Sequence, residues 1–222
     1  MDENLKSVIL KRINRVSEGL QKNNMEFYYA ETKEDVPGIV ESLLNEGDIV
    51  SSGGSMTLKQ CGVIDLLKSN KYKYLDRDAV GIDSIDQLYR ASFSADAYLS
   101  SANAITENGE LYNVDGNSNR IAAIAFGPKS VIIVAGYNKI VKDIYEAQKR
   151  VKMVSAPANV QRLTCATYCF ESGKCISLNS GDSEISTGCN SDARICCNYL
   201  ISAKQKHKGR IKVIIVGERL GY

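Results

Sequence analysis

The sequence contains only one histidine, His207, which lies in the basic stretch 204–212. A Ser-His-Asp triad would have to use this residue, and a metal site built from several histidines is impossible. The surrounding lysines indicate a solvated loop residue. Catalytic triads and histidine-based metal sites are therefore not expected.

The chain also lacks a charge excess and long apolar runs. Its 28 Lys and Arg face 26 Asp and Glu, a net charge of +2, so neither nucleic acid nor an anionic membrane is expected as the main partner. The longest apolar runs, such as 131–135, are far too short to span a bilayer. The acidic start leads into no apolar stretch typical of a signal peptide. We therefore expect a cytoplasmic protein that binds no membrane.

Strand-like and helix-like segments alternate for most of the length, which predicts an α/β fold around a mainly parallel sheet flanked by helices. An antiparallel hairpin at 105–114 interrupts this pattern, and Asn108-Gly109 predicts a type I′ turn within it. With 222 residues we expect one domain, 1–222, which includes a cysteine-rich metal-binding segment at 157–200. Helices are expected at 4–22, 34–44, 56–67, 85–93, 120–126 and 138–151, and the main strands at 25–30, 48–50, 97–101, 131–135 and 212–217.

Cysteine is concentrated in one segment: six of the seven cysteines lie between residues 165 and 197. In a reducing compartment such clustering more often indicates metal or redox chemistry than disulfides. The remaining cysteine, Cys61, is expected in the core. Four ligands spaced C-x5-C-x13-C-x6-C would suit an iron–sulfur cluster or a structural zinc. The absence of C-x2-C knuckles favours a cluster, of the 4Fe-4S type, held by Cys169, Cys175, Cys189 and Cys196.

The sequence leaves open how many cysteines bind the metal centre. Cys165 or Cys197 could replace one of the four, and the turn-rich stretch 176–188, interpreted as a surface loop, separates Cys175 from Cys189. Three ligands would leave one iron open as a Lewis acid, whereas four would favour electron transfer or a structural role.

Two polar segments are candidates for a binding site. Residues 50–58 predict a strand, a glycine turn and a helix start, where an anion can approach the backbone closely. The same glycines could equally form a simple helix cap. The stretch 101–120 is rich in Asn, Asp, Ser and Thr, and Arg120 could hold a carboxylate or phosphate through two hydrogen bonds. Turn formation is the alternative for this stretch.

These motifs together resemble the lactate-utilisation (LUD) domain family. The resemblance rests on the segments 52–58, 101–109, 113–122, 127–129, 136–141 and 156–163 and on the cysteines. It implies an α/β fold of the ribose-5-phosphate isomerase and CoA-transferase type. It also implies a site for a small anion at Gly53, Gly54, Ser55, Asn103, Asp115, Asn119, Arg120, Asn138 and Lys139. Cysteine-containing members resemble C-x5-C-x2-C-x6-C, so the middle gap is longer here.

The resemblance implies participation in lactate oxidation beside iron–sulfur partner proteins. We therefore expect an iron–sulfur oxidoreductase component that acts on a small 2-hydroxy or 2-oxo acid such as lactate. A non-redox iron–sulfur enzyme, such as a lyase, hydrolase or isomerase of a small anion, is one alternative. An effector-binding or redox-sensing module without enzymatic activity, holding zinc or a labile cluster, is another. The sequence leaves a homo-oligomer open.

Overall fold

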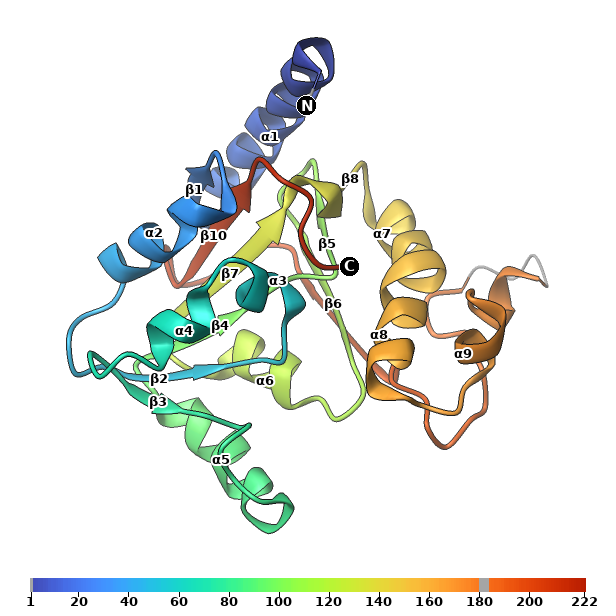
Figure 1. Ribbon diagram of the computed structural model, residues 1–222. Helices are drawn as coiled ribbons and strands as arrows, with labels where there is room; N and C mark the ends of the chain where they lie inside the picture. The colour runs from blue at the N-terminus through green and yellow to red at the C-terminus, as the bar shows by residue number, and fades with distance from the viewer. Residues whose placement is uncertain (1, 180–183) are drawn as a thin grey trace.

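The computed structural model describes residues 2–179 and 184–222 and contains two sheets with helices around them (Figure 1). The strands are β1 (Glu26–Ala30), β2 (Ile49–Ser52), β3 (Lys73–Leu75), β4 (Ala97–Ser100), β5 (Ala104–Thr106), β6 (Leu111–Asp115), β7 (Ser130–Gly136), β8 (Ile140–Val141), β9 (Asn198–Ser202) and β10 (Ile211–Val216). The helices are α1 (Glu3–Lys22), α2 (Val36–Ser42), α3 (Met56–Gln60), α4 (Val63–Leu67), α5 (Ile85–Ala91), α6 (Asn119–Phe126), α7 (Ile144–Arg150), α8 (Ala156–Leu163) and α9 (Tyr168–Ser172).

The larger sheet has the strand order β1-β10-β7-β4-β2-β3, and every neighbouring pair is parallel. The α/β class with a mainly parallel sheet is therefore confirmed. Its central strand β7 is apolar on both sides: Val131 and Ile133 pack into one core, and Ile132 and Val134 into the other. Such a strand needs a covered face on each side, because parallel sheets bury both.

Helices cover each face of this sheet. On one face α1 contributes Ile9, Ile13, Val16 and Leu20, whose spacing places them on one side of a helix. Helix α6 lies on the same face, and α2, α3 and α4 cover the opposite face through their own apolar residues. Helix α1 begins after Asp2, whose carboxylate accepts a hydrogen bond from the Leu5 amide and satisfies one of the free amides of the first turn.

The smaller sheet has the order β8-β5-β6-β9, with the β5–β6 hairpin at its centre. It packs against α7 and the following π-helical turn (Val151–Ser155) through Tyr112, Ala147 and Val151. In Figure 1 the helices α7, α8 and α9 form a group beside this sheet, away from α2 and α4. The described part of the cysteine-rich segment belongs to this group.

Several local expectations were wrong. Only Gly109 of the Asn108-Gly109 pair has a positive φ, at +79°, so the turn is not type I′. A side chain at Gly109 would meet the backbone of Gly19, which makes glycine necessary where the turn touches α1. The helix expected over 56–67 is interrupted at Gly62, which has φ of +69°. The helix expected over 138–151 begins only at Ile144, because residues 140–141 form β8.

Three strands of the larger sheet end side by side at its carboxyl edge. They are β2, β4 and β7, which end at Ser52, Ser100 and Gly136. The chain leaves β2 toward β3 on one side and later adds β4 on the other side. Ligands of open α/β sheets bind at this kind of reversal.

Part of the surface loop predicted at 176–188, residues 180–183, lies outside the described residues. No helix in the described ranges is long and apolar enough to cross a membrane.

Candidate functional site

A cavity of about 280 Å³ opens at the carboxyl edge of the larger sheet. Its volume is close to the lower end of the roughly 300–1,000 Å³ typical of ligand pockets. Its walls carry four basic side chains and, among the lining residues, a single side-chain carboxylate, that of Asp115. The basic residues are Arg77, Arg120, Lys139 and Arg162. This imbalance favours a small anionic ligand.

Most of the residues implied by the family resemblance lie around this cavity. Those that line it are Gly54, Ser55, Asn103, Asp115, Asn119, Arg120 and Lys139. Gly53 lies behind the lining, where a Cβ atom would come within 3.0 Å of the Arg120 side chain. Asn138 also lies outside the lining and exchanges hydrogen bonds with the backbone of Leu220. These two residues therefore support the walls.

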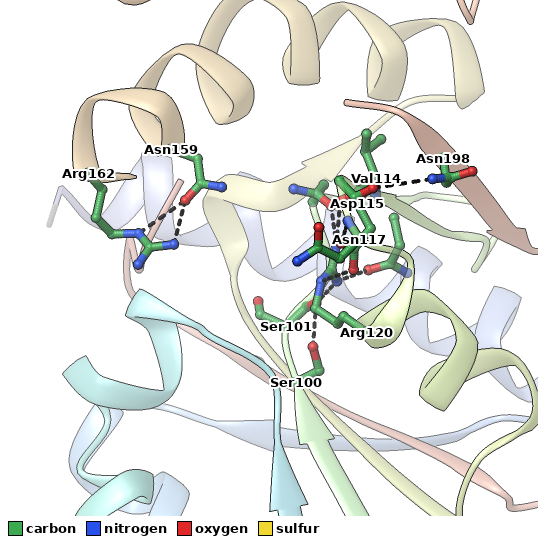
Figure 2. Close-up of polar contacts among 12 residues, drawn as sticks. Ser100, Ser101, Val114, Asp115, Asn117, Arg120, Asn159, Arg162 and Asn198 are labelled. Atoms are coloured by element: carbon green, nitrogen blue, oxygen red, sulfur yellow. Dashed lines mark hydrogen bonds and ion pairs between the residues drawn. The ribbon is translucent and has the colours of Figure 1, made fainter. Parts of the chain in front are cut away.

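Arg120 is held by the protein rather than left open (Figure 2). Its Nη1 donates to the Ser101 carbonyl at 3.1 Å and to Asn113 Oδ1 at 2.7 Å. Its Nη2 donates to Asn103 Oδ1 at 3.1 Å and to the Val114 carbonyl at 2.7 Å. Both terminal nitrogens are thus occupied, and a ligand could be bound by them only in exchange for these bonds. The arrangement makes Arg120 a residue that positions the cavity wall.

Two polar atoms beside Arg120 have no hydrogen-bond partner among the described residues. They are Asp115 Oδ2 and Asn113 Nδ2, and both are buried. Asp115 Oδ2 lies 3.6 Å from Arg120 Nε, close enough for attraction but beyond a good hydrogen bond. Unsatisfied buried groups are rare and costly, so water or a ligand group at this point would be favourable.

Sequence reasoning missed Arg77 and Arg162 as residues of this site, and it included Thr57 and Ser101 only as members of the two polar candidate segments. Thr57 and Ser101 hold the Lys139 amine, and Arg77 lies over Gly54. Arg162 comes from α8 and donates to Asn159 of the same helix (Figure 2). Thr57, Ser101 and Arg162 fall within the segments that carry the family resemblance. Arg77 falls in none of them, so no comparable signal identified it.

A second, mostly apolar cavity contains the four cysteines expected to bind a metal. Cys169, Cys175, Cys189 and Cys196 all line it. Cys165 and Cys197 are absent from its lining, and the thiol of Cys197 donates to the Arg194 carbonyl instead. All seven cysteines are free of disulfides, and Cys61 is buried in the core. The fold therefore brings together the four thiols spaced as C-x5-C-x13-C-x6-C.

The four thiols are of the donor type that an iron–sulfur cluster or a zinc ion takes. In the described ranges, however, no three His, Cys, Asp or Glu side chains are grouped so that they could hold a metal ion. The hydroxyl of Tyr112, which lines this cavity, is buried without a described partner. It could donate to a sulfur of a cluster, the type of contact that tunes such groups.

Arg194 braces the loop that carries two of these cysteines. Its guanidinium donates to the carbonyls of Cys189, Cys196 and Ser186. One side chain thus joins the end of the long insertion to the last predicted ligand. Burial raises the pKa of the Cys196 thiol, and Arg194 partly opposes that shift.

The cysteine cavity is small, about 20 Å³, which is room for roughly one water. The surrounding loops would have to move outward around a cluster.

The two cavities lie back to back. Ile195 lines the basic cavity and the adjacent Cys196 lines the cysteine cavity. In the helical segment 151–163, Ser155 and Asn159 face the basic cavity, while Val151 and Ala156 face the cysteines. The linings share no residue. One layer of protein therefore separates the two sites.

Replacing Arg120 with alanine should destabilise the fold, because four protein oxygens would lose a buried, charged donor. We expect the free energy of unfolding in urea to fall by about 3 kcal/mol. Arg162→Ala is the matched control, since two of its nitrogens reach only Asn159 of its own helix; a change of at most about 0.5 kcal/mol is expected there. Equal losses in the two variants would contradict the role given to Arg120.

Among solved structures, the chain is similar to a DUF162 family protein from Deinococcus radiodurans, with 16% identity and a TM-score of 0.52. That match covers 96% of this chain and 98% of the other, and at this identity it shows the fold alone. A match to eIF2B beta from Chaetomium thermophilum has 14% identity and a TM-score of 0.38, and covers 51% of this chain and 40% of the other. No curated protein matches. The LUD domain model matches residues 13–216, and the chain therefore belongs to the LUD domain family.

Proposed function

We propose that this protein is an iron–sulfur component of an oxidoreductase that acts on a small 2-hydroxy or 2-oxo acid. The observation that carries the proposal is the position of the four-cysteine cavity directly behind a basic cavity. Such an acid would bind at the carboxyl edge of the sheet, and a cluster would be held on the other side of one protein layer. Membership of the LUD domain family supports this combination.

The basic cavity suits a carboxylate. Within the described part of the chain, Arg77 donates no hydrogen bond and forms one ion pair, between its Nε and Asp78 Oδ1 at 3.7 Å. Its guanidinium also lies 5.8 Å from the centre of the Tyr89 ring. Two nitrogens of Arg162 donate to Asn159, and its Nη1 donates to no acceptor among the described residues. These two arginines are therefore the groups best placed to bind the acid.

The cysteine cavity suits electron transfer more than Lewis-acid chemistry. Four thiols are available for four irons, and a wall made of Ile195 and the helical segment 151–163 stands between them and the basic cavity. A Lewis acid must touch the substrate oxygen, whereas an electron can cross a thin protein layer. When bound, a cluster supplies one-electron transfer. Oxidation of a 2-hydroxy acid releases two electrons and two protons, so a redox partner protein has to accept the electrons in turn.

Protein purified without oxygen should carry a cluster. We expect a broad absorption band near ~400 nm and about four irons and four sulfides per chain, because four cysteines line one cavity. Serine at Cys169, Cys175, Cys189 or Cys196 should remove most of the iron. The matched controls Cys165→Ser and Cys197→Ser should retain it, because neither residue lines the cavity. Colourless protein with stoichiometric zinc would overturn the cluster assignment.

Arg77→Gln should weaken binding of lactate or pyruvate about tenfold or more, because one charged hydrogen-bond donor to the carboxylate is lost. Isothermal titration calorimetry of the cluster-loaded protein measures the effect. Arg90→Gln removes the same charge from an exposed residue that pairs with Asp86 and should leave binding unchanged. If Arg77→Gln binds as tightly as the wild type, the acid does not bind where we propose.

The redox role is tested with the same loaded protein. In the presence of a one-electron dye, a 2-hydroxy acid should be oxidised and the dye reduced, with two equivalents of dye for each molecule of acid. The Cys175→Ser variant should lose this activity while still binding the acid, since Cys175 lines only the cysteine cavity. Loaded protein that binds the acids but never exchanges electrons with them would contradict the oxidoreductase assignment.

A further inference from the structure

The Lys139 amine is buried at the basic cavity without an acidic partner. Lys139 ends the 3-10 turn after β7, and the residue is 3% exposed. Its Nζ donates to Thr57 Oγ1 at 3.0 Å and to Ser101 Oγ at 2.9 Å. None of the described Asp and Glu residues forms an ion pair with it or acts on its charge. Buried lysines are normally paired with an acidic group, so a buried amine that has only hydroxyl partners is unusual.

The surroundings of Lys139 favour the uncharged amine. Burial contributes most, the positive charges of Arg150 on α7 and Arg120 on α6 add to it, and only Cys61 after α3 opposes them. The pKa of Lys139 is lowered to about 7. At neutral pH, about a thousand times more of this residue is uncharged than of an ordinary lysine with a pKa near 10.4.

The hydrogen bonds match the uncharged form. A neutral amine has two N–H bonds and one lone pair, whereas an ammonium group has three donors. Thr57 and Ser101 provide two acceptor oxygens, and these lie 3.5 Å from each other. The lone pair is then left for a group in the cavity. A desolvated lysine of this kind is the usual nucleophile toward a carbonyl carbon.

We infer that Lys139 Nζ forms a reversible imine with the carbonyl carbon of a small 2-oxo acid bound in the basic cavity. The amine lone pair attacks the carbonyl carbon, and a C–N bond forms. The amine protons pass to the former carbonyl oxygen, by way of the Thr57 and Ser101 hydroxyls, and this oxygen leaves as water when the C–O bond breaks. No electrons are gained or lost, so no oxidant is needed.

The imine would give the protein an activity beyond electron transfer. An imine of a 2-oxo acid makes the hydrogens on the neighbouring carbon acidic, so Lys139 could support proton exchange or carbon–carbon bond chemistry at that carbon. The inference rests on the proposed function only for the class of ligand, a 2-oxo acid. It does not depend on a cluster.

Reductive trapping tests the inference directly. The full-length wild-type protein is incubated with pyruvate and sodium cyanoborohydride from below to above neutral pH, and the attached groups are located by peptide mass spectrometry. We expect attachment at Lys139, half-maximal near pH 7, because the uncharged amine accumulates as the pH rises through about 7. Lys139→Arg should abolish this product, and the exposed control Lys142→Arg should retain it.

The attachment sites found in the wild-type protein decide the question even if the Lys139 variant fails to fold. Attachment spread over exposed lysines, with none at Lys139, would overturn the inference. Calorimetry with lactate, which has no keto group, separates the two proposals. If lactate binds but no group is trapped at Lys139, the imine proposal is wrong and the proposed function still stands. If a group is trapped at Lys139 in protein that never acquires iron, the imine proposal is supported and the cluster proposal is wrong.

Discussion

The site depends on the guanidinium of Arg120 and the oxygens around it. This one group joins the Ser101 carbonyl after β4, Asn103 before β5, and Asn113 and Val114 in β6. It thereby fixes the smaller sheet to the carboxyl edge of the larger one. Gly53 leaves room for this side chain, since a Cβ atom there would lie only 3.0 Å from Arg120 Cδ. Without these bonds, the smaller sheet would lose this link to the larger one.

The cost of burying positive charge shapes the chemistry of the cavity. Arg150 donates to the carbonyls of Asn103 and Asn138 and to Ser155, and burial lowers its pKa to about 10. Lys139 lies near it and has only hydroxyl partners, so burial and the neighbouring positive charges lower the pKa of this amine as well. Uncompensated charge in a protein interior is relieved either by such neutralisation or by a bound anion. The same surroundings thus favour an anionic ligand and an uncharged amine.

The cysteine cavity has its own constraint, which is the long insertion between Cys175 and Cys189. A loop can lengthen at little entropic cost when its ends stay in place. Arg194 holds one end through the Ser186 and Cys189 carbonyls, and at the other end the Cys175 amide donates to the Lys152 carbonyl. Tyr112 reaches the same cavity from β6. The two neighbouring strand residues Asn113 and Val114 are bound to Arg120. Strand β6 therefore borders both cavities, with Tyr112 in the lining of the cysteine cavity and Val114 in the lining of the basic cavity.

The sequence by itself determined the α/β class, because strand and helix patterns alternate and the runs in β7 and β10 are apolar on both faces. It also identified the glycine loop, Arg120, Lys139 and the cysteine spacing as candidates. It could not give the roles of Arg120 and Lys139, which depend on contacts between segments far apart in the chain. Thr57 and Ser101 meet at Lys139 only because β2, β4 and β7 end at one edge. That convergence, and the placing of Ile195 and Cys196 on opposite sides of one wall, were decided by the tertiary structure, since local patterns carry no information about which distant groups share a cavity.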